Sequence, residues 1–346
     1  PSAATLSGLF AAHYSQRIAQ AAPEDRKTLQ QSLHDLQLAG PFWADSDRLQ
    51  PDESQDFYVP TPFVYLVEKG SDEISQTLSW QAHPQKAHRT GWRNQDQQVP
   101  IGKFESHTWL ALSQWHQPQF VKKAPWSFLP HLHPRLEADQ RRVAVPANAA
   151  NGESDRPQGS LFLENSVQMP TDIQLVYLAN QPLTSGWYRF GGEGHIAEVR
   201  CLDLAEHIQT QLAQPVGTTF ALITPAIWGS NRLSTRYPEA WQDRFVSSQP
   251  GQESFLTAKP IPFRYRLGDR KDEHGNNIHQ PHQPKLLSRG RYAVPPGTVY
   301  QLKTAQDCWY NWETEWFPKE GPSLKRWGCG LALALPPINL SQTLAS

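Results

Sequence analysis

The segments of this 346-residue chain that can form secondary structure are short, and stretches rich in its 30 prolines and 21 glycines separate them. Proline lacks a backbone N–H and is largely excluded from helix interiors and central strands, so it limits the length of each element. In the last third of the chain, strand-like runs are interleaved with few helices. This pattern favours an α+β fold over a doubly wound parallel sheet. The runs lie at residues 263–267, 292–294, 298–302 and 331–335.

The beginning of the chain has helical spacing. Apolar residues recur three or four positions apart, and the pattern stops at Gly40-Pro41, which predicts a pair of helices over residues 3–38. The chain begins at Pro1 rather than at a methionine, so we expect a preceding segment to be missing and the first element to be incomplete. The apolar positions are Leu6, Leu9, Phe10, Tyr14, Ile18, Leu29, Leu33, Leu36 and Leu38.

Composition predicts further elements between these regions. Residues 109–115 and 198–212 have helical spacing, and residues 143–159 are rich in proline, alanine, asparagine, glycine and serine, which predicts a mobile loop or hairpin. Strands are predicted from β-branched and aromatic content at residues 63–67, 160–164, 172–178 and 220–227.

Length and charge limit the class of protein. A chain of this size can form two domains that each bury a core. Its formal net charge of −1 means that any nucleic-acid site must be local. No apolar run approaches the roughly 18 residues of a membrane span, and no signal segment opens the chain, so we expect a cytoplasmic protein without a membrane partner. The isolated Cys201, Cys308 and Cys329 predict neither disulfides nor a thiolate zinc site.

The nine residues 186–194 (GWYRFGGEG) place four glycines around an arginine and aromatic residues. We expect this segment to follow a strand and precede a helix. Glycines in such a position allow positive φ and bring backbone N–H groups close to a phosphate. The spacing is neither the dinucleotide fingerprint nor a Walker A loop, and a simple tight turn is an equal alternative.

A second glycine element lies at residues 325–330 (KRWGCG), where two basic residues precede a GxG and an apolar strand. Basic side chains beside bare backbone can hold a phosphate. A GxG before a strand also commonly marks a bulge or a turn.

Positive charge is concentrated between Lys259 and Arg291. Tyr265 and Tyr292 interleave with these residues, a combination that suits single-stranded RNA, because charges track phosphates and aromatic rings stack on bases. A solvated basic face is the alternative. The segment holds eight basic residues (Lys259, Arg264, Arg266, Arg270, Lys271, Lys285, Arg289 and Arg291) against Asp269, Asp272 and Glu273, so 8 − 3 = +5.

The sequence contains no specific catalytic or metal-binding motif. His131 and His133 lack carboxylate or thiolate partners at the usual ligand spacing. Glu193 near His195 is only a weak hint of catalysis. We therefore predict no catalytic centre, no metal and no cofactor.

Several strings, taken in order along the chain, resemble the Cas5-like RAMP subunits of type III-B CRISPR (Cmr) effector complexes. The resemblance covers most of the chain. The strings are PS…LSG (1–8), FYVPTP (57–62), HLHPRL (131–136) with GSLF (159–162), FGGEG (190–194), LITPA (222–226), RGRYAVPPGTVY (289–300) and the glycine loop at 325–330.

This resemblance implies two ferredoxin-like (RRM-like, βαββαβ) RAMP domains with irregular insertions. We place them at residues 1–180, where the first strand of the family's domain is missing and a flexible insertion lies near 141–159, and at 181–346, with the C-terminal glycine-rich loop. It also implies a non-catalytic subunit that binds and caps the 5′ repeat-derived tag of the crRNA. The expected protein partners in antiviral interference are a Cas10-type large subunit and an adjacent Cas7-type backbone RAMP subunit.

The resemblance places the crRNA tag against the first helix, the GGEG loop and the C-terminal glycine loop, with a hairpin near 141–159 acting as a thumb on the RNA. We expect arginines and lysines to contact phosphates and glycine-loop amides to set the register. The family's usual Gly-Ala-Leu-Arg is Gly8-Leu9-Phe10-Ala11 here, so an expected arginine is absent. The predicted RNA-binding residues are Ser7, Arg189, Gly191, Gly192, Gly194, Arg264, Arg266, Arg289, Arg291, Lys325, Arg326, Gly328 and Gly330.

Three alternatives remain open at this point. The first is the same role in a type III-D or other type III complex. The second is a repeat-RNA endoribonuclease of the RAMP superfamily that uses His13 or His195 as a general base. The third is a protein-only scaffold whose basic segment contacts acidic partners.

Overall fold

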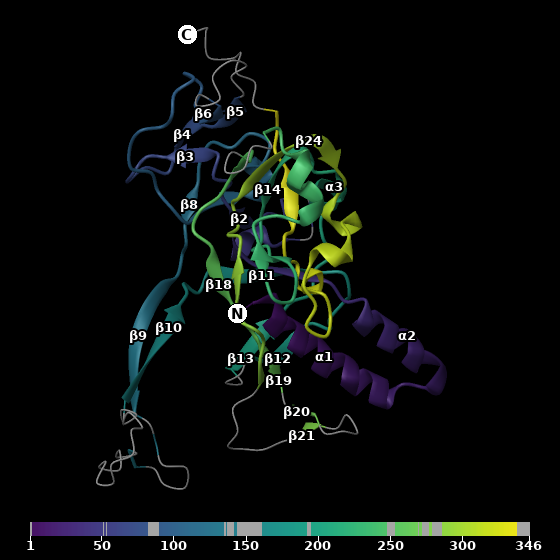
Figure 1. The fold of residues 1–346 in the computed structure, drawn as a ribbon. Helices are drawn as coiled ribbons and strands as arrows, with labels where there is room; N and C mark the ends of the chain where they lie inside the picture. The colour runs from purple at the N-terminus through teal and green to yellow at the C-terminus, as the bar shows by residue number, and fades with distance from the viewer. Residues whose placement is uncertain are drawn as a thin grey trace, which may run out of the picture. The chain divides into compact units, whose positions relative to one another are not determined.

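The computed structural model describes residues 2–50, 52, 54–81, 90–134, 136, 142–143, 161–191, 195–247, 253–268, 270–271, 277–278 and 286–337 (Figure 1). The chain forms two compact units. One contains residues 1–123 together with 174–346, and the other contains residues 124–173. Strands dominate and helices are few, which confirms the α+β class. The more specific arrangement as two ferredoxin-like domains divided at residue 180 stays a prediction.

A five-stranded sheet of the larger unit has the order β11-β1-β2-β7-β8. The antiparallel pairs place Trp43 opposite Tyr58, and Tyr58 opposite Ala111. Side chains alternate across a strand, so Phe42 and Ala44 enter the main core while the Trp43 ring stacks on Tyr58 on the other face, 4.1 Å between centroids. The strands are β11 (Ile173–Ala179), β1 (Leu38–Asp45), β2 (Tyr58–Pro60), β7 (Thr108–Ala111) and β8 (Lys122–Lys123).

The second sheet has four strands in the order β17-β24-β14-β25, and its pairings are antiparallel. Its buried face is unusually aromatic: Phe220 on β14 and Tyr300 on β24 pack with Trp228, Trp241 and Trp312. One buried cluster contains these rings as well as Phe42 and Ala44 of the first sheet, so the main core includes residues from both halves of the chain. The strands are β17 (Phe255–Leu256), β24 (Val299–Gln306), β14 (Gly217–Leu222) and β25 (Ala332–Ala334).

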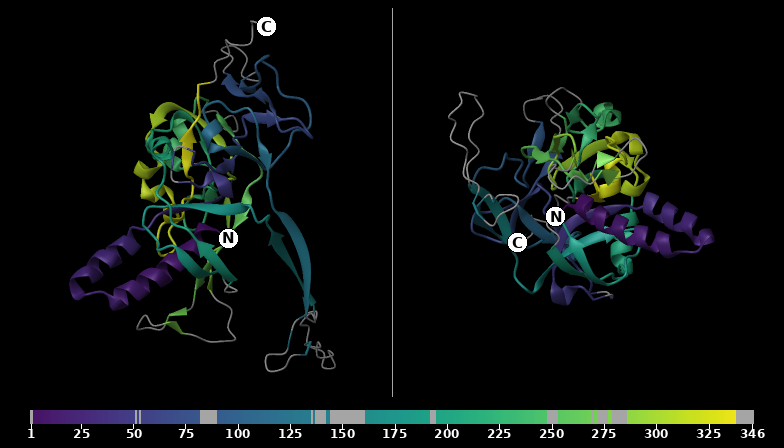
Figure 2. Two further views of the ribbon diagram at one scale, coloured as in Figure 1. Left: turned by 180° about the vertical axis from the view of Figure 1, so that it is seen from behind. Right: turned by 90° about the horizontal axis from the view of Figure 1, so that it is seen from below.

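Two helices, α1 (Ala3–Gln20) and α2 (Pro23–His34), confirm the predicted helical pair and lie side by side (Figures 1 and 2). Leu6, Phe10 and Tyr14 bury the N-terminal half of α1 in a second, smaller core. α2 buries none of its residues, and it begins with proline and two acidic residues, which suit the first turn of a helix.

The remaining elements of the larger unit are short. Its third α-helix in the described chain is α3 (Glu206–Ala213). The 3-10 helices are η1 (Ser46–Arg48), η3 (Leu112–Gln114), η4 (Glu239–Arg244), η5 (Trp309–Asn311), η6 (Thr314–Trp316) and η7 (Leu324–Trp327). The two-stranded pairs are β3 (Tyr65–Val67) with β4 (Ile74–Thr77), β5 (Ser79–Gln81) with β6 (Gly91–Arg93), β12 (Gly186–Phe190) with β13 (His195–Val199), β15 (Trp228–Gly229) with β16 (Ser234–Thr235), β18 (Ile261–Phe263) with β23 (Arg291–Ala293), β19 (Arg266–Gly268) with β22 (Leu286–Leu287), and β20 (Arg270–Lys271) with β21 (Asn277–Ile278).

Three local predictions were wrong in whole or in part. Residues 109–115 were expected to be helical, and residues 112–114 do form the 3-10 helix η3, but β7 occupies 108–111 because it pairs with β2 and β8. The helix expected over 198–212 is limited to α3, since residues 195–199 form β13. The GGEG segment was expected between a strand and a helix, yet it connects β12 and β13, which pair with each other. In each case cross-strand hydrogen bonds outweigh the local spacing.

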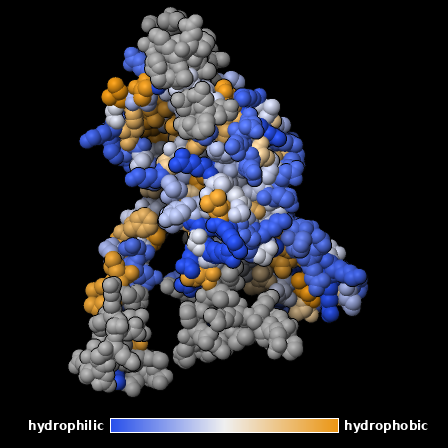
Figure 3. Space-filling model, in the orientation of Figure 1, coloured by the Kyte–Doolittle hydropathy of each residue, from blue (hydrophilic) through white to orange (hydrophobic). Residues whose placement is uncertain are grey.

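The smaller unit contains an antiparallel ribbon of β9 (Ser127–Pro134) and β10 (Leu161–Gln168). The register puts apolar residues on one face, and several are strongly exposed, including Phe128, Leu132 and Leu163 (Figure 3). Most of the loop or hairpin predicted at 143–159 lies outside the described residues; Val143 forms an isolated bridge with Leu136.

No helix in the described ranges is long and apolar enough to cross a membrane.

A glycine near the end of the chain is predicted to be critical for stability. Gly328 has φ +69°, and a Cβ there would lie 2.5 Å from the Leu38 carbonyl oxygen and from Ala39 Cβ. We expect Gly328→Ala to lower the free energy of unfolding by about 2 kcal/mol more than Gly217→Ala. Gly217 is the matched control, because it has the same φ of +69° with open space around its Cβ position. Urea unfolding measures both, and equal losses would contradict the close approach at Gly328.

Candidate nucleic-acid interface

The β12–β13 hairpin lies against the first helix. Tyr188, Phe190 and Val199 face α1 and pack on its small core. The Tyr188 hydroxyl donates to the Thr184 carbonyl oxygen at 2.6 Å. These contacts leave the other face of the hairpin, which carries Arg189, exposed to solvent. The structure therefore brings the first helix and the predicted glycine segment together.

The position of Ser7 and of the hairpin glycines follows from this packing. Ser7 is half-buried on α1, and Gly191 is exposed with φ +85° and open space at its Cβ position. A positive φ at the start of the connection is a conformation that glycine adopts without strain. Gly192 and Gly194, predicted to contact RNA, lie outside the described residues.

Trp327 in η7 joins the C-terminal loop to this region. Its ring is partly buried against both the main core and the smaller α1 core. It also makes an edge contact with Tyr265, 4.4 Å between ring centroids. The basic segment, through Tyr265, and the α1 core therefore both contact this indole, and the hairpin packs on the same α1 core.

Lys325 was predicted to contact phosphate, but its side chain points into the protein and is 6% exposed. Its ammonium donates to the carbonyl oxygens of Tyr310 at 2.8 Å and Trp312 at 2.5 Å, and it lies 5.3 Å from the centre of the Trp309 ring. Burial lowers the pKa of this amine. Lys325 holds two turns of the loop that follows β24, and we leave it out of the RNA surface proposed below.

Arg326 has a similar internal role. Its guanidinium donates to the carbonyl oxygens of Leu33 at 2.6 Å and His34 at 3.2 Å. These carbonyls lie at the C-terminus of α2, where a helix leaves acceptors unpaired and favours a cation. Burial lowers the pKa of Arg326. The residue ties the helical pair to the C-terminal loop.

The backbone amides of the C-terminal glycine loop already have acceptors. The Gly328 N–H donates to the Lys325 carbonyl at 2.9 Å, and the Gly330 N–H donates to the Pro225 carbonyl at 3.0 Å. The Leu331 N–H donates to Thr224 Oγ1 at 2.9 Å. Gly328 and Gly330 permit close packing, because a Cβ on Gly330 would lie 2.7 Å from the Trp228 ring. In this structure the loop is a packing element.

A carboxylate organises the predicted basic segment. Arg291 is 7% exposed and its Nη2 lies 2.7 Å from Glu320 Oε1. The same carboxylate accepts hydrogen bonds from the Arg289 N–H at 3.2 Å and from the Tyr265 hydroxyl at 3.3 Å. Both arginines also donate to the Asn231 carbonyl oxygen. Arg291 therefore forms an internal ion pair.

Tyr265 and Tyr292, which the sequence suggested for base stacking, have different environments. Tyr265 is 7% exposed and contacts Trp327 and Glu320, so it is a core residue, and burial raises the pKa of its hydroxyl. Tyr292 on β23 is 62% exposed. Only Tyr292 presents its ring to solvent.

Four of the predicted cations remain at the surface: Arg189, Arg264, Arg266 and Arg289. Arg264 Nε donates to the Ser288 carbonyl at 2.9 Å, and Arg289 is anchored through Asn231. No described residue forms an ion pair with Arg189 or Arg266. These arginines lie on the hairpin and on the basic segment, and they define the candidate nucleic-acid interface.

The histidines proposed for an endoribonuclease have separate environments. His13 is half-buried on α1, with Nδ1 3.5 Å from the Tyr188 hydroxyl and Nε2 enclosed. Burial and the nearby Arg17 lower the pKa of this imidazole. His195 is exposed at the start of β13. Within the described ranges no three histidine, cysteine or acidic side chains group as metal ligands.

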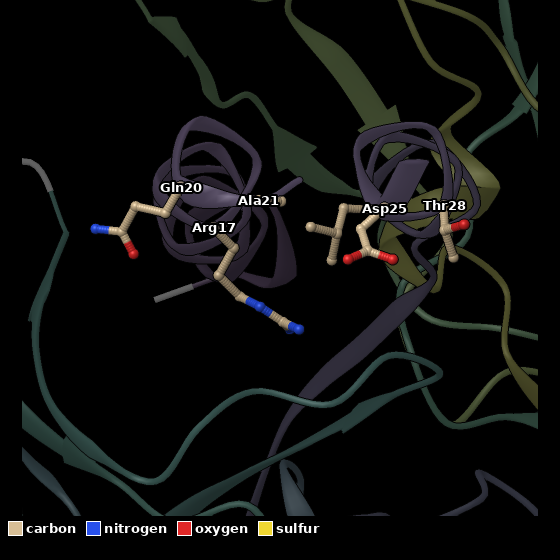
Figure 4. Close-up of a pocket in the computed structure, with 6 residues that line it drawn as sticks. Arg17, Gln20, Ala21, Asp25 and Thr28 are labelled. Carbon is tan, nitrogen blue, oxygen red and sulfur yellow. The ribbon is translucent and has the colours of Figure 1, made fainter. Parts of the chain in front are cut away.

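A hollow of about 390 Å³ lies where α1 ends and α2 begins (Figure 4), and none of the four surface arginines lines it. It is open to solvent, and Arg17 of α1 and Asp25 of α2 contribute opposite charges. Nothing in its lining favours a phosphate. The lining residues are Arg17, Gln20, Ala21, Asp25, Thr28 and Leu29.

The described chain is a mixed α+β protein with a small group of arginines at its surface. Residues 1–337 match the family described as CRISPR-associated protein (Cas_Cmr3). The chain belongs to this family, and is thus a Cas5-like subunit of the type III-B Cmr effector class. This result confirms the resemblance found in the sequence.

Solved structures give more distant likenesses. One is a chain of the cryo-EM structure of the type III-B Cmr-beta complex bound to cognate target RNA, with 10% identity, a TM-score of 0.39 and coverage of 87% of this chain and 75% of that chain. Another is a chain of the crystal structure of the Csm3–Csm4 subcomplex of the type III-A CRISPR–Cas interference complex, with 11% identity, a TM-score of 0.35 and 88% of each chain covered. These scores are too low to support further argument. No curated protein matches the sequence.

The Arg291–Glu320 pair is predicted to stabilise the fold. Glu320→Gln would leave a buried guanidinium without its counter-charge, which should cost roughly 3 kcal/mol of unfolding free energy. The control is Glu315→Gln, because Glu315 is 73% exposed and 3.7 Å from Lys319, a pair expected to contribute less than about 0.5 kcal/mol. Urea unfolding of both variants tests the difference. A loss no larger for Glu320→Gln than for Glu315→Gln would show that Arg291 has another counter-charge.

Proposed function

We propose that this subunit binds and caps the 5′ repeat-derived tag of the crRNA in its Cmr effector complex, without catalysing a reaction. Membership of the Cas_Cmr3 family supports the RNA-guided setting. The observation that carries the proposal is that α1 and the basic segment both pack on Trp327 while the β12–β13 hairpin packs on the same α1 core, with Arg189, Arg264, Arg266 and Arg289 at the surface.

The proposed RNA surface divides the predicted residues into two groups. Ser7, Gly191, Gly192 and Gly194 belong with the four exposed arginines, which would track phosphates. Arg291, Lys325, Arg326, Gly328 and Gly330 would act indirectly by holding these elements in place. A near-neutral chain with a few unpaired arginines suits a short RNA segment better than a long duplex.

The protein partners and location remain part of the proposal. A Cas10-type large subunit and an adjacent Cas7-type backbone subunit would flank this chain, and the complex would act in the cytoplasm. The β9–β10 ribbon carries the segment near 141–159 that we propose as an RNA thumb. Its exposed apolar face is suited to contact either nucleobases or a neighbouring subunit.

The salt dependence of binding tests the phosphate contacts. Each contact on single-stranded nucleic acid contributes roughly 0.7 to the slope of log K against log salt concentration. Replacing Arg189, Arg264 and Arg266 together by alanine in the assembled complex should therefore weaken tag binding and reduce the slope by about 2. Filter binding at several salt concentrations, with tag RNA as the probe, measures both changes.

The matched control removes the same charge elsewhere. Lys27, Lys103 and Lys303 are exposed and lie outside the interface, so their triple alanine variant should retain the wild-type slope. An equal change of slope in both triple variants would show that the effect comes from net charge and not from contacts at the interface.

Crosslinking of a labelled 5′ tag to residues 186–191 or 264–266 would support the tag assignment, whereas crosslinks to other subunits alone would favour a protein scaffold. Cleavage of repeat RNA that His13→Ala abolishes would favour the endoribonuclease.

A further inference from the structure

The outward face of the β12–β13 hairpin has an unusual composition. The antiparallel register pairs Trp187 with Glu198 and Arg189 with Ile196. Since Tyr188, Phe190 and Val199 face α1, the alternation of side chains places these four residues together on the solvent face. Trp187 is 71% exposed and Ile196 is 62% exposed.

The exposure of Trp187 sets it apart from the other tryptophans. The chain has 13 tryptophans, all within the described residues, and Trp187 is the only one in the exposed class. The others are buried or half-buried, and several form the aromatic core with Phe220 and Tyr300. An indole leaves a large apolar area in water when it lacks a partner, so this position is explained best by a ligand that covers the ring.

The neighbouring side chains indicate what kind of ligand fits. Arg189 lies two residues along the same strand face, exposed and without an ion-pair partner among the described residues. An aromatic ring next to a free guanidinium matches one nucleotide unit, whose base stacks while its phosphate pairs with the cation. Glu198, directly opposite Trp187, would repel a phosphate on its own side. The charges therefore orient the nucleotide, with its backbone toward Arg189 and its base over Trp187.

We propose that Trp187 is a stacking platform for one unpaired nucleobase of the guide RNA, with the adjacent phosphate held by Arg189. This inference rests on the proposed RNA-binding function and adds a specific base contact to it. Ile196 forms an apolar edge beside the arginine. The carboxylate of Glu198 can accept a hydrogen bond from an exocyclic amino group, which adenine, cytosine and guanine have and uracil lacks.

A protein partner is the competing occupant of this face. The face carries only four side chains, whereas a stable protein interface uses roughly 20–30 residues on each partner, and a pair of opposite charges flanks a single exposed ring. These features favour a single base. The experiment below separates the two occupants.

The test combines a protein change with an RNA change in the assembled complex. Trp187→Ala should weaken binding of the 5′ tag RNA about tenfold, because loss of one aromatic stack on a base has an effect of this size. Trp187→Phe should restore most of the affinity. An abasic site is then placed at each position of the tag in turn. At one position it should weaken binding to the wild-type protein by the same factor, and it should weaken binding to Trp187→Ala no further.

Controls make each outcome decisive. Ile101→Ala removes another exposed apolar side chain, 91% exposed, and should leave binding unchanged. Thermal unfolding should be the same for wild type and Trp187→Ala, since the ring has few contacts. The platform would be overturned if the effects of Trp187→Ala and of the abasic site on affinity were additive at every position. It would also be overturned if Trp187→Ala weakened assembly of the subunit but left RNA affinity intact, a result that would indicate a protein contact. Wild-type affinity in Trp187→Ala would also overturn it, while the proposed function would stand. If wild-type protein does not bind the tag, the proposed function itself fails.

Discussion

The turn from Leu324 to Gly330 is the constraint on which the interface depends. Arg326 bonds to the last carbonyls of α2, Trp327 packs on both cores and on Tyr265, and Gly328 lies against β1. Through these contacts one short loop fixes the helical pair, the first sheet and the basic segment with respect to one another. Gly328 allows this close approach because it has no Cβ, and Arg326 donates hydrogen bonds to the carbonyl oxygens at the end of α2.

The chain uses its positive charge in two ways. Arg291 and Lys325 are buried, and each satisfies its donors with a carboxylate or with carbonyl oxygens, since an unpaired buried charge would be strongly destabilising. Arg189 and Arg266 remain in solvent, where a phosphate can reach them. The first group holds the neighbouring loops in place, and the second group would supply affinity for RNA in the function that we propose. A net charge near zero is therefore compatible with a local RNA site.

Trp187 shows how an exposed aromatic side chain can be maintained by its surroundings. The hairpin that carries it is held through its opposite face, where Tyr188 and Phe190 pack on α1. Two-stranded ribbons are only marginally stable alone, so this packing is needed to present the outer face in one conformation. The same dependence links the proposed base contact to the first helix and to Trp327.

The sequence by itself determined the features that depend on local periodicity. These are the helical pair, the strands at the eight apolar runs, the α+β class and the family, whose motifs occur in order along the chain. Tertiary structure decided the rest. Lys325 and Arg266 look equivalent in the sequence, yet one bonds to Tyr310 and Trp312 while the other faces water. Gly328 meets Leu38, far away along the chain. Burial and pairing depend on such long-range contacts, which residue spacing does not specify, and this is why the roles of individual cations, glycines and aromatic residues required the fold.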